Sequence, residues 1–173
     1  MDLVKNMNIR KKTWCQKGFT LVETIAVLIL VGIIAVFAGM GITSVIEGFL
    51  LTKMNAETTQ KGQVALTRIV KEFTVINSVD SGASSATSIT FTSYKQGVAG
   101  IHVVSWVGDN LSLDGDILTD HVIGFDLGYY DFYNGTKQST WASTRKVIEI
   151  TLSIRGAKDV ISVFTDRVAP RNL

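Results

Sequence analysis

The sequence predicts an α+β protein in which one long N-terminal helix precedes an antiparallel β-sheet. Residues 21–46 contain a single charged side chain, that of Glu23. Between residues 66 and 76, apolar side chains recur at the spacing of one helix face. After residue 87, short segments rich in β-branched and aromatic residues alternate with turn residues, as in strands joined by hairpins. Together these patterns predict a helix that runs into a folded β domain.

The predicted helix has two parts with different surroundings. Residues 19–46 are apolar on all sides, and at about 1.5 Å per residue they are long enough to cross a bilayer. Residues 47–77 are more polar but keep one apolar face, so we expect an amphipathic continuation packed on the β domain. Glu57 and Lys61 have the i, i+4 spacing of a favourable ion pair. The apolar face consists of Leu66, Ile69, Val70, Phe73 and Ile76.

Residues 78–173 are expected to form the β domain. The small and polar residues 78–87 predict a loop that ends the helix. The clearest strand is 146–154, where apolar residues from Ile148 to Ile154 alternate with polar ones. Antiparallel hairpins with one polar face suit a sheet covered by the apolar helix face. The other predicted strands are residues 88–94, 101–107, 111–113, 121–131 and 160–165.

The charge of the chain is unevenly distributed. Residues 1–18 carry five basic side chains and one acidic side chain, so the remaining chain has a net charge of −2 although the whole chain has +2. This weakens a nucleic-acid interpretation based on net charge, and we expect no nucleic-acid partner. Basic residues beside a first membrane helix stay cytoplasmic, which orients the helix.

The run from Lys17 through Gly18-Phe19-Thr20-Leu21-Val22 to Glu23 lies between the basic leader and the apolar stretch. A carboxylate in a membrane helix costs about 2.5–3.5 kcal/mol at mid-bilayer and less near the interface. Such a group is therefore a functional candidate that needs a partner. Cleavage directly after Gly18 would create an amino terminus able to neutralise Glu23.

Over residues 11–48 the sequence resembles the type IV prepilins: a basic leader, a glycine, Phe-Thr-Leu-x-Glu and an apolar helix. The resemblance implies that prepilin peptidase cuts between Gly18 and Phe19 and methylates the Phe19 amine. It also implies that Glu23 pairs with the Phe19 ammonium of a neighbouring subunit. The implied partners are prepilin peptidase, other pilin or pseudopilin subunits, an inner-membrane assembly platform and, before assembly, membrane lipid.

The resemblance also implies the pilin fold and a division into four segments. The leader would be residues 1–18, the transmembrane and filament-core helix 19–46, the amphipathic helix 47–77 and the globular antiparallel β domain 78–173. The protein would cross the bacterial inner membrane once, with its N-terminus cytoplasmic and its β domain periplasmic, and then enter a filament. Many pilins close a C-terminal loop with a disulfide, but here the single cysteine, Cys15, lies in the leader.

Short segments of the second half of the chain look like those of W-type minor pilins and J-type type II secretion pseudopilins. This narrower resemblance implies a place near the filament tip. A pilus and a secretion pseudopilus, and a major and a minor subunit, stay open as alternatives. The segments are Asp120-His121-Val122 running to Phe125, Tyr129-Tyr130-Asp131, Arg145 with Ile148-x-Ile150-x-Leu152, and Phe164 to Val168 with Arg171-Asn172.

A first alternative is a signal-anchored extracytoplasmic protein of another function. Val36-Phe37-Ala38 fits a signal-peptide cleavage site. The apolar run continues beyond Ala38, however, whereas a signal h-region spans about 7–15 residues. A signal h-region also has no use for Glu23, so we favour the prepilin interpretation.

A second alternative is a tip adhesin or DNA-uptake subunit. Aromatic side chains near Arg145 and Lys146 would then stack on bases or glycans. We expect these aromatic side chains to pack in the β core or at subunit interfaces instead. They are Trp106, Tyr129, Tyr130, Tyr133 and Trp141.

The sequence gives little support for catalysis. It contains no Gly-x-Ser-x-Gly, phosphate-binding glycine loop or His-Glu-x-x-His pattern. His102 and His121 fall in separate predicted strands, so we expect no enzyme and no cofactor. Carboxylates in turns are calcium ligands in some proteins, although turns favour Asp by themselves. The weak calcium candidates are Asp109, Asp114, Asp116 and Asp120.

Overall fold

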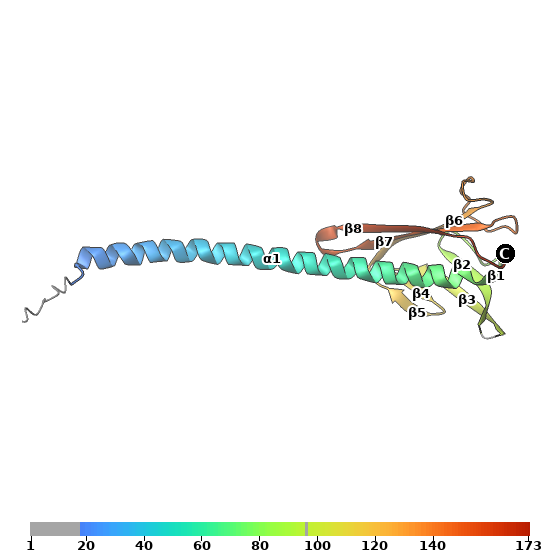
Figure 1. The fold of residues 1–173 in the computed structure, drawn as a ribbon, viewed down its shortest axis with the longest axis horizontal. Coiled ribbons are helices and arrows are strands. Elements are labelled where there is room, and N and C mark those ends of the chain that lie inside the picture. Colours follow the sequence, from blue (N-terminus) through green and yellow to red (C-terminus); the bar gives the residue numbers. More distant parts are fainter. Residues whose placement is uncertain (1–17, 96) are drawn as a thin grey trace, which may run out of the picture. The chain divides into compact units, whose positions relative to one another are not determined.

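The computed structural model describes residues 18–95 and 97–173, so residues 1–17 of the predicted leader, with Cys15, lie outside the described residues. The chain divides between Ile46 and Glu47 into two compact units. One long helix is followed by antiparallel strands, which confirms the predicted α+β class (Figure 1). The elements are α1 (Leu21–Thr74), β1 (Ile76–Val79), β2 (Ser88–Lys95), β3 (Val98–Val107), β4 (Asn110–Leu113), β5 (Asp116–Thr119), β6 (Val122–Tyr130), β7 (Val147–Arg155), the 3-10 turn η1 (Ala157–Asp159) and β8 (Ile161–Val168).

Helix α1 ends at Thr74, three residues before its predicted end at 77. The next residues form β1, which pairs with β2 and occupies the start of the predicted loop 78–87. Ile76 is fully buried, as the helical periodicity predicted, but it is buried as part of a strand. Periodicity therefore predicted the burial of this side chain and missed the change of backbone conformation.

Strands β1 to β5 form a five-stranded antiparallel sheet, called sheet A, in which each strand pairs with the next one along the chain. The predicted strands 88–94, 101–107 and 111–113 correspond to β2, β3 and β4, whereas β1 and β5 were not predicted. Asp114 and Gly115 both have positive φ angles, 57° and 91°, in the tight turn between β4 and β5. This turn is the Asp-Gly hairpin type, whose twist matches that of the flanking strands.

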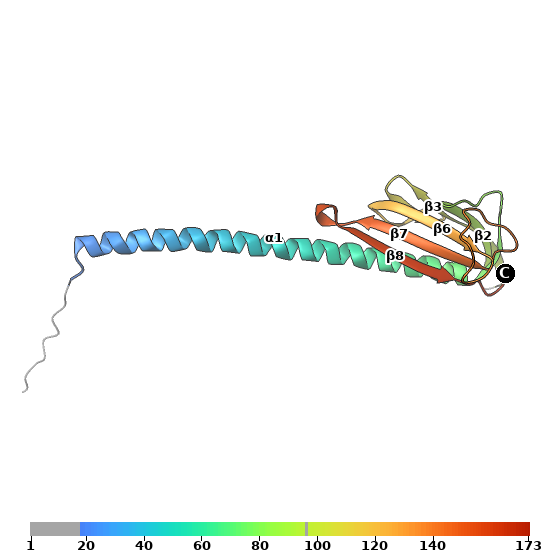
Figure 2. The same ribbon diagram turned by 90° about the horizontal axis from the view of Figure 1, so that it is seen from above.

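Strands β6 to β8 form a second, three-stranded antiparallel sheet, called sheet B, and lie side by side in Figure 2. The sequence predicted one sheet, and the structure has two. The chain leaves sheet A after β5 at Asp120 and His121, where His121 has a φ of 56°. The clearest predicted strand is the central strand β7, in which Ile148, Ile150, Leu152 and Ile154 are buried.

The hydrophobic core joins both sheets to the second part of α1. Ile69 and Phe73 are buried, which confirms the centre of the predicted helix face. Leu66 and Val70 of that face are only partly buried, and Ala65, which was not predicted, is buried. The Phe73 ring meets the Phe91 ring of β2 edge-on, with centroids 5.5 Å apart. Gly62 lets the helix approach sheet B closely, because a Cβ atom there would lie 2.4 Å from Phe164 Cε2.

An ion pair links α1 to the turn before β6. Lys61 Nζ donates a hydrogen bond to Asp120 Oδ1 at 3.1 Å. The sequence predicted Glu57, one helical turn away, as the partner of Lys61. In the structure the partner is instead Asp120, which is 59 residues away along the chain.

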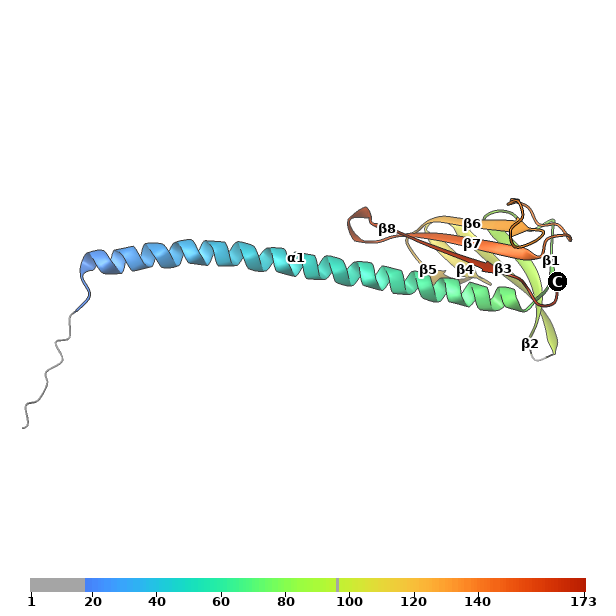
Figure 3. The ribbon, with the colours of Figure 1, turned by 45° about the horizontal axis from the view of Figure 1, so that its top comes forward.

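The C-terminus of the chain lies beside the end of α1 and strand β1 (Figure 3). The Arg171 backbone N–H donates to the Thr74 carbonyl at 3.1 Å. One of the unpaired carbonyls that a helix leaves at its C-terminus is thereby satisfied.

Candidate functional site

The first turn of α1 is capped by Thr20, the residue directly before the helix. Its carbonyl accepts hydrogen bonds from the backbone N–H groups of Glu23 and Thr24, each at 3.1 Å. Its hydroxyl also accepts from the Glu23 N–H, at 3.3 Å. Thr20 was not among the residues predicted to have a role, although Thr-x-x-Glu before an apolar run is the signature of a capping box.

Gly18 and Phe19 lie outside the helix and are exposed. The peptide bond between them therefore precedes the capped turn and is open to an enzyme. A Cβ atom built on Gly18 would meet nothing within 4 Å. Packing within the described chain therefore does not require glycine at this position.

Glu23 is the third residue of α1 and is exposed. A carboxylate in the first helical turn is favoured by the partial positive charge of the helix N-terminus. Within residues 18–95 and 97–173, no side chain donates a hydrogen bond to this carboxylate. The described chain therefore leaves the acidic group open to a partner.

The helix from Leu21 to Leu50 is exposed at every position although most of its side chains are apolar. α1 is long and apolar enough to cross a membrane. The hydroxyl of Thr24 donates to the Leu21 carbonyl, and those of Thr43 and Ser44 both donate to the Met40 carbonyl, at 2.8–3.1 Å. These internal bonds lower the cost of placing hydroxyl groups in lipid.

Residues 15–39 match the family model described as the prokaryotic N-terminal methylation motif. The chain carries a prepilin-type signature. No curated protein and no solved structure matches the chain. The signature supports a type IV pilin-like precursor, and it implies processing by prepilin peptidase and assembly with other pilin subunits. The exposed apolar helix fits a pilin anchored in the inner membrane.

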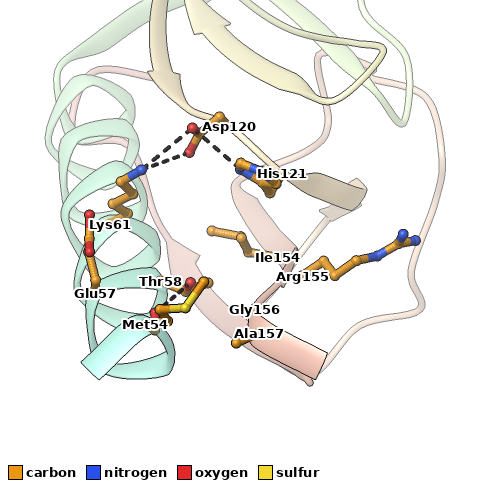
Figure 4. Close-up of a pocket in the computed structure, with 10 residues that line it drawn as sticks. All are labelled: Met54, Glu57, Thr58, Lys61, Asp120, His121, Ile154, Arg155, Gly156 and Ala157. Carbon is orange, nitrogen blue, oxygen red and sulfur yellow. Dashed lines mark hydrogen bonds and ion pairs between the residues drawn. The ribbon is translucent and has the colours of Figure 1, made fainter. Parts of the chain in front are cut away.

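In the folded unit of the chain, a cleft of about 210 Å³ lies between α1 and the end of β7 (Figure 4). Its polar centre is Asp120, which contacts Lys61 on one side and His121 on the other, the latter at 3.3 Å. The hydrogen bond from Lys61, with a smaller effect of His121, lowers the pKa of Asp120. The Asp120 carboxylate is thus already bound to the Lys61 side chain of α1. The Thr58 hydroxyl, which also lines the cleft, donates to the Met54 carbonyl of its own helix.

The structure does not bring the four calcium candidates together. Asp114 accepts hydrogen bonds from the Val103 N–H at 2.8 Å and contacts His102 Nδ1 at 2.7 Å. Asp120 is paired with Lys61, Asp109 lies in the β3–β4 turn, and Asp116 begins β5. Among the residues that the structure describes, no three potential ligands are grouped so as to hold a metal ion.

The aromatic residues considered for base or glycan stacking do not form a surface platform. Tyr129, Tyr130 and Trp141 are buried, and the Trp141 ring meets Tyr129 edge-on with centroids 5.6 Å apart. Burial raises the pKa of Tyr129, whose hydroxyl donates to the Ser85 carbonyl at 2.8 Å. Only Tyr133 of the five is largely exposed. Core packing therefore accounts for most of this set.

The exposed side of sheet B carries a network of ion pairs. Arg167 Nε donates to Glu149 Oε2 at 2.6 Å, and its guanidinium lies 4.7 Å from the centre of the Tyr130 ring. Burial raises the pKa of Glu149, but hydrogen bonds from Arg167 and Tyr130 outweigh this effect and leave the pKa below its ordinary value. Lys137 pairs with Asp126 on the same side of the sheet.

Proposed function

We propose that the protein is a structural subunit of a type IV pilus-like or type II secretion filament. Prepilin peptidase cleaves after Gly18 and methylates the new amino terminus of Phe19. The mature helices then bundle, and Glu23 neutralises the Phe19 ammonium of a neighbouring subunit. The subunit is a building block of the filament and has no catalytic role.

The observation that carries this proposal is the open carboxylate of Glu23 at the start of a fully exposed apolar helix. An uncompensated charge in apolar surroundings is costly, and an opposite charge with good geometry offsets that cost. An amino terminus four residues before Glu23 in the same sequence supplies such a charge on every copy. Pairing between neighbours therefore satisfies both groups and sets the register of adjacent helices.

The proposed roles follow the sequence in order. Residues 1–18 are the leader, 19–46 anchor the precursor in lipid and then form the filament core, and 47–77 extend from that core into the folded unit. Residues 78–173 supply the β domain. Before assembly the precursor resides in the inner membrane with its N-terminus cytoplasmic. An assembly platform in that membrane then transfers it to the filament. The segments near the C-terminus favour a minor pilin or pseudopilin.

The mass of the N-terminal peptide of the membrane-purified protein tests the proposal. We expect a peptide that begins with N-methylated Phe19. A terminus at Met1, or one created after Ala38, would contradict the proposal and favour a signal-anchored protein.

Replacement of Gly18 by Leu tests the processing step. Because nothing in the chain lies near this position, Gly18→Leu is expected to leave the folded unit unchanged and to abolish cleavage. Gly39→Leu is the matched control, since a Cβ there also meets nothing within 4 Å. The measurement is the gel mobility of each variant in cells that contain prepilin peptidase. Normal cleavage of Gly18→Leu would refute the assigned site.

A further inference from the structure

Within the folded unit, helix α1 presents two different kinds of surface to the sheets. From Gly62 onward its inward face is buried and mostly apolar. Between residues 47 and 61 no residue is buried. Three of the four half-buried residues in this earlier stretch are polar, so apolar packing contributes little to its docking. The four, which have the spacing of one helix face, are Leu51, Asn55, Thr58 and Thr59.

One hydrogen bond joins this stretch to the turn between β7 and β8. We call residues 51–61 the strap. The Asn55 Oδ1 atom accepts from the Ala157 backbone N–H at 2.9 Å. The hydroxyls of Thr58 and Thr59 donate instead to carbonyls of their own helix. The polar face of the strap therefore reaches the turn through Asn55 alone.

The strap borders the cleft described above. Met54 of the strap and Ile154 of β7 are among the residues that line this space (Figure 4). At the far end of the strap, Lys61 binds Asp120 through a pair in which both side chains are nearly half exposed. Among the described residues, Asn55 and Lys61 are the only strap residues whose side chains form hydrogen bonds outside α1. Segments with few buried apolar contacts open at a lower free energy than the core does.

The turn between β7 and β8 is held by its own hydrogen bonds. The Gly156 N–H donates to the Val160 carbonyl at 2.7 Å, and the Val160 N–H donates to the Ala157 carbonyl at 3.2 Å. Lys158 and Asp159 both have positive φ angles, 51° and 59°. Residues other than glycine keep this conformation where the surrounding structure fixes it. The Ala157 N–H is therefore presented by a fixed turn, and movement at this contact falls to the strap.

Glycine at position 156 leaves room for the Asn55 contact. A Cβ atom at this position would lie 2.5 Å from Asn55 Oδ1. The backbone of Gly156, with φ −95° and ψ −164°, is one that other residues also adopt. The contact with Asn55, and not the backbone of the turn, therefore accounts for the glycine.

We propose that the strap opens from sheet B as a unit, that Asn55 holds it closed, and that the helix from Gly62 to Thr74 stays packed meanwhile. The bend falls beside Gly62, where glycine weakens the helix. Because this point lies within the folded unit, the strap changes its angle to sheet B without loss of the core. The inference goes beyond the proposed filament function and does not depend on it.

Distances between nitroxide labels on the full chain in detergent, measured by electron paramagnetic resonance, test this movement. In a Cys15→Ser background, the first label pair is at Ala56→Cys on the strap and Val160→Cys beside the turn, both exposed positions. The second pair is at Val64→Cys on the packed part of the helix and Val163→Cys on β8, also exposed. We expect a minor, longer distance in the first pair and a single distance in the second.

Four variants identify what holds the strap. Asn55→Ala should raise the population at the longer distance about three- to tenfold, as expected for the loss of one neutral hydrogen bond. Asn55→Asp keeps an acceptor oxygen and should leave that population at the wild-type level. Gly156→Ala should act like Asn55→Ala, because its methyl group displaces the Asn55 oxygen. Thr58→Ala is the matched control, since the Thr58 hydroxyl lines the same cleft but bonds to its own helix.

The second label pair also reports whether each variant keeps its core. A longer distance in both pairs would mean that the whole helix leaves the sheets, and would overturn the proposal. An increase that Asn55→Asp or Thr58→Ala shares with Asn55→Ala would overturn the role of Asn55. One unchanged distance in every variant would show that the strap is as rigid as the core, and would also overturn the proposal. These outcomes leave the filament function untouched, because the mass of the N-terminal peptide tests that function separately.

Discussion

The first part of α1 is apolar at most positions and the second part keeps one apolar face, and the two parts place their apolar side chains in opposite surroundings. From Leu21 to Leu50 every residue is exposed, whereas Ala65, Ile69 and Phe73 are buried against both sheets. The second part is stabilised by the chain that carries it. The first part has no such cover within the described residues, so its apolar surface is satisfied only by lipid or by other subunits. The helix therefore combines a part that is covered by its own chain with a part whose apolar surface needs cover from outside the chain.

The largest expected effect comes from Glu23→Ala in the exposed part. Removal of one partner of a buried ion pair costs about 3–5 kcal/mol, which corresponds to at least about a hundredfold loss of association. Cleavage after Gly18 should continue, since the cleaved bond lies outside the capped turn. The measurement is the fraction of mature protein in sheared filaments, with Glu47→Ala as the control on the same helix. Normal incorporation of Glu23→Ala would contradict the proposed pairing.

Two phenylalanines test the contrast between the parts of α1 directly. Phe73→Ala should lower the free energy of unfolding of the folded unit by about 3–5 kcal/mol, because it leaves a cavity beside Phe91. Phe37, which is 71% exposed, should change that free energy by less than about 0.5 kcal/mol when replaced by Ala. Denaturation of the full chain in detergent, followed by tryptophan fluorescence, measures both. Equal losses would show that the two parts are not distinct.

Gly62→Leu is expected to destabilise the folded unit by about 1–3 kcal/mol, because the added side chain overpacks the contact with Phe164 and Ile154. Gly48→Leu adds the same atoms to the same helix where nothing lies within 4 Å of the new Cβ. It should be neutral or slightly stabilising, since Leu has the higher helix propensity. A stable Gly62→Leu variant would mean that the helix does not approach sheet B closely.

The smallest expected effect is that of Lys61→Met. The pair with Asp120 is about half exposed and should contribute about 0.2–1 kcal/mol at pH 7. Because Lys61 lowers the pKa of Asp120, the contribution is present above the ordinary pKa of 3.8 and is lost as the pH falls through the lower folded value. Denaturation of wild type and Lys61→Met at pH 7 and at low pH measures this, with exposed Lys53→Met as the control. A difference that persists below the folded pKa would exclude the ion pair as its source.

Local patterns in the sequence predicted the features that depend on neighbouring residues. The spacing of Ile69 and Phe73 predicted the buried helix face, and the alternation from Ile148 to Ile154 predicted the central strand of sheet B. The run from Gly18 to Glu23 predicted the signature that the methylation-motif match bears out.

The features that were missed depend on contacts between distant residues. Strand β1 forms because it pairs with the edge of β2. The local sequence of residues 76–79 gives no information about that edge, so it does not predict the strand. Lys61 pairs with Asp120 only because the turn before β6 lies beside α1. The chain passes from sheet A to sheet B at His121, whose positive φ angle leaves no signal in the pattern of apolar residues.

The hydrogen bonds that begin α1 use the carbonyl and hydroxyl oxygens of Thr20, together with N–H groups further along the chain. None of these atoms belongs to the residues that precede Phe19. The proposed cleavage after Gly18 would therefore break none of the hydrogen bonds that start the helix among the described residues, and would leave its first turn capped.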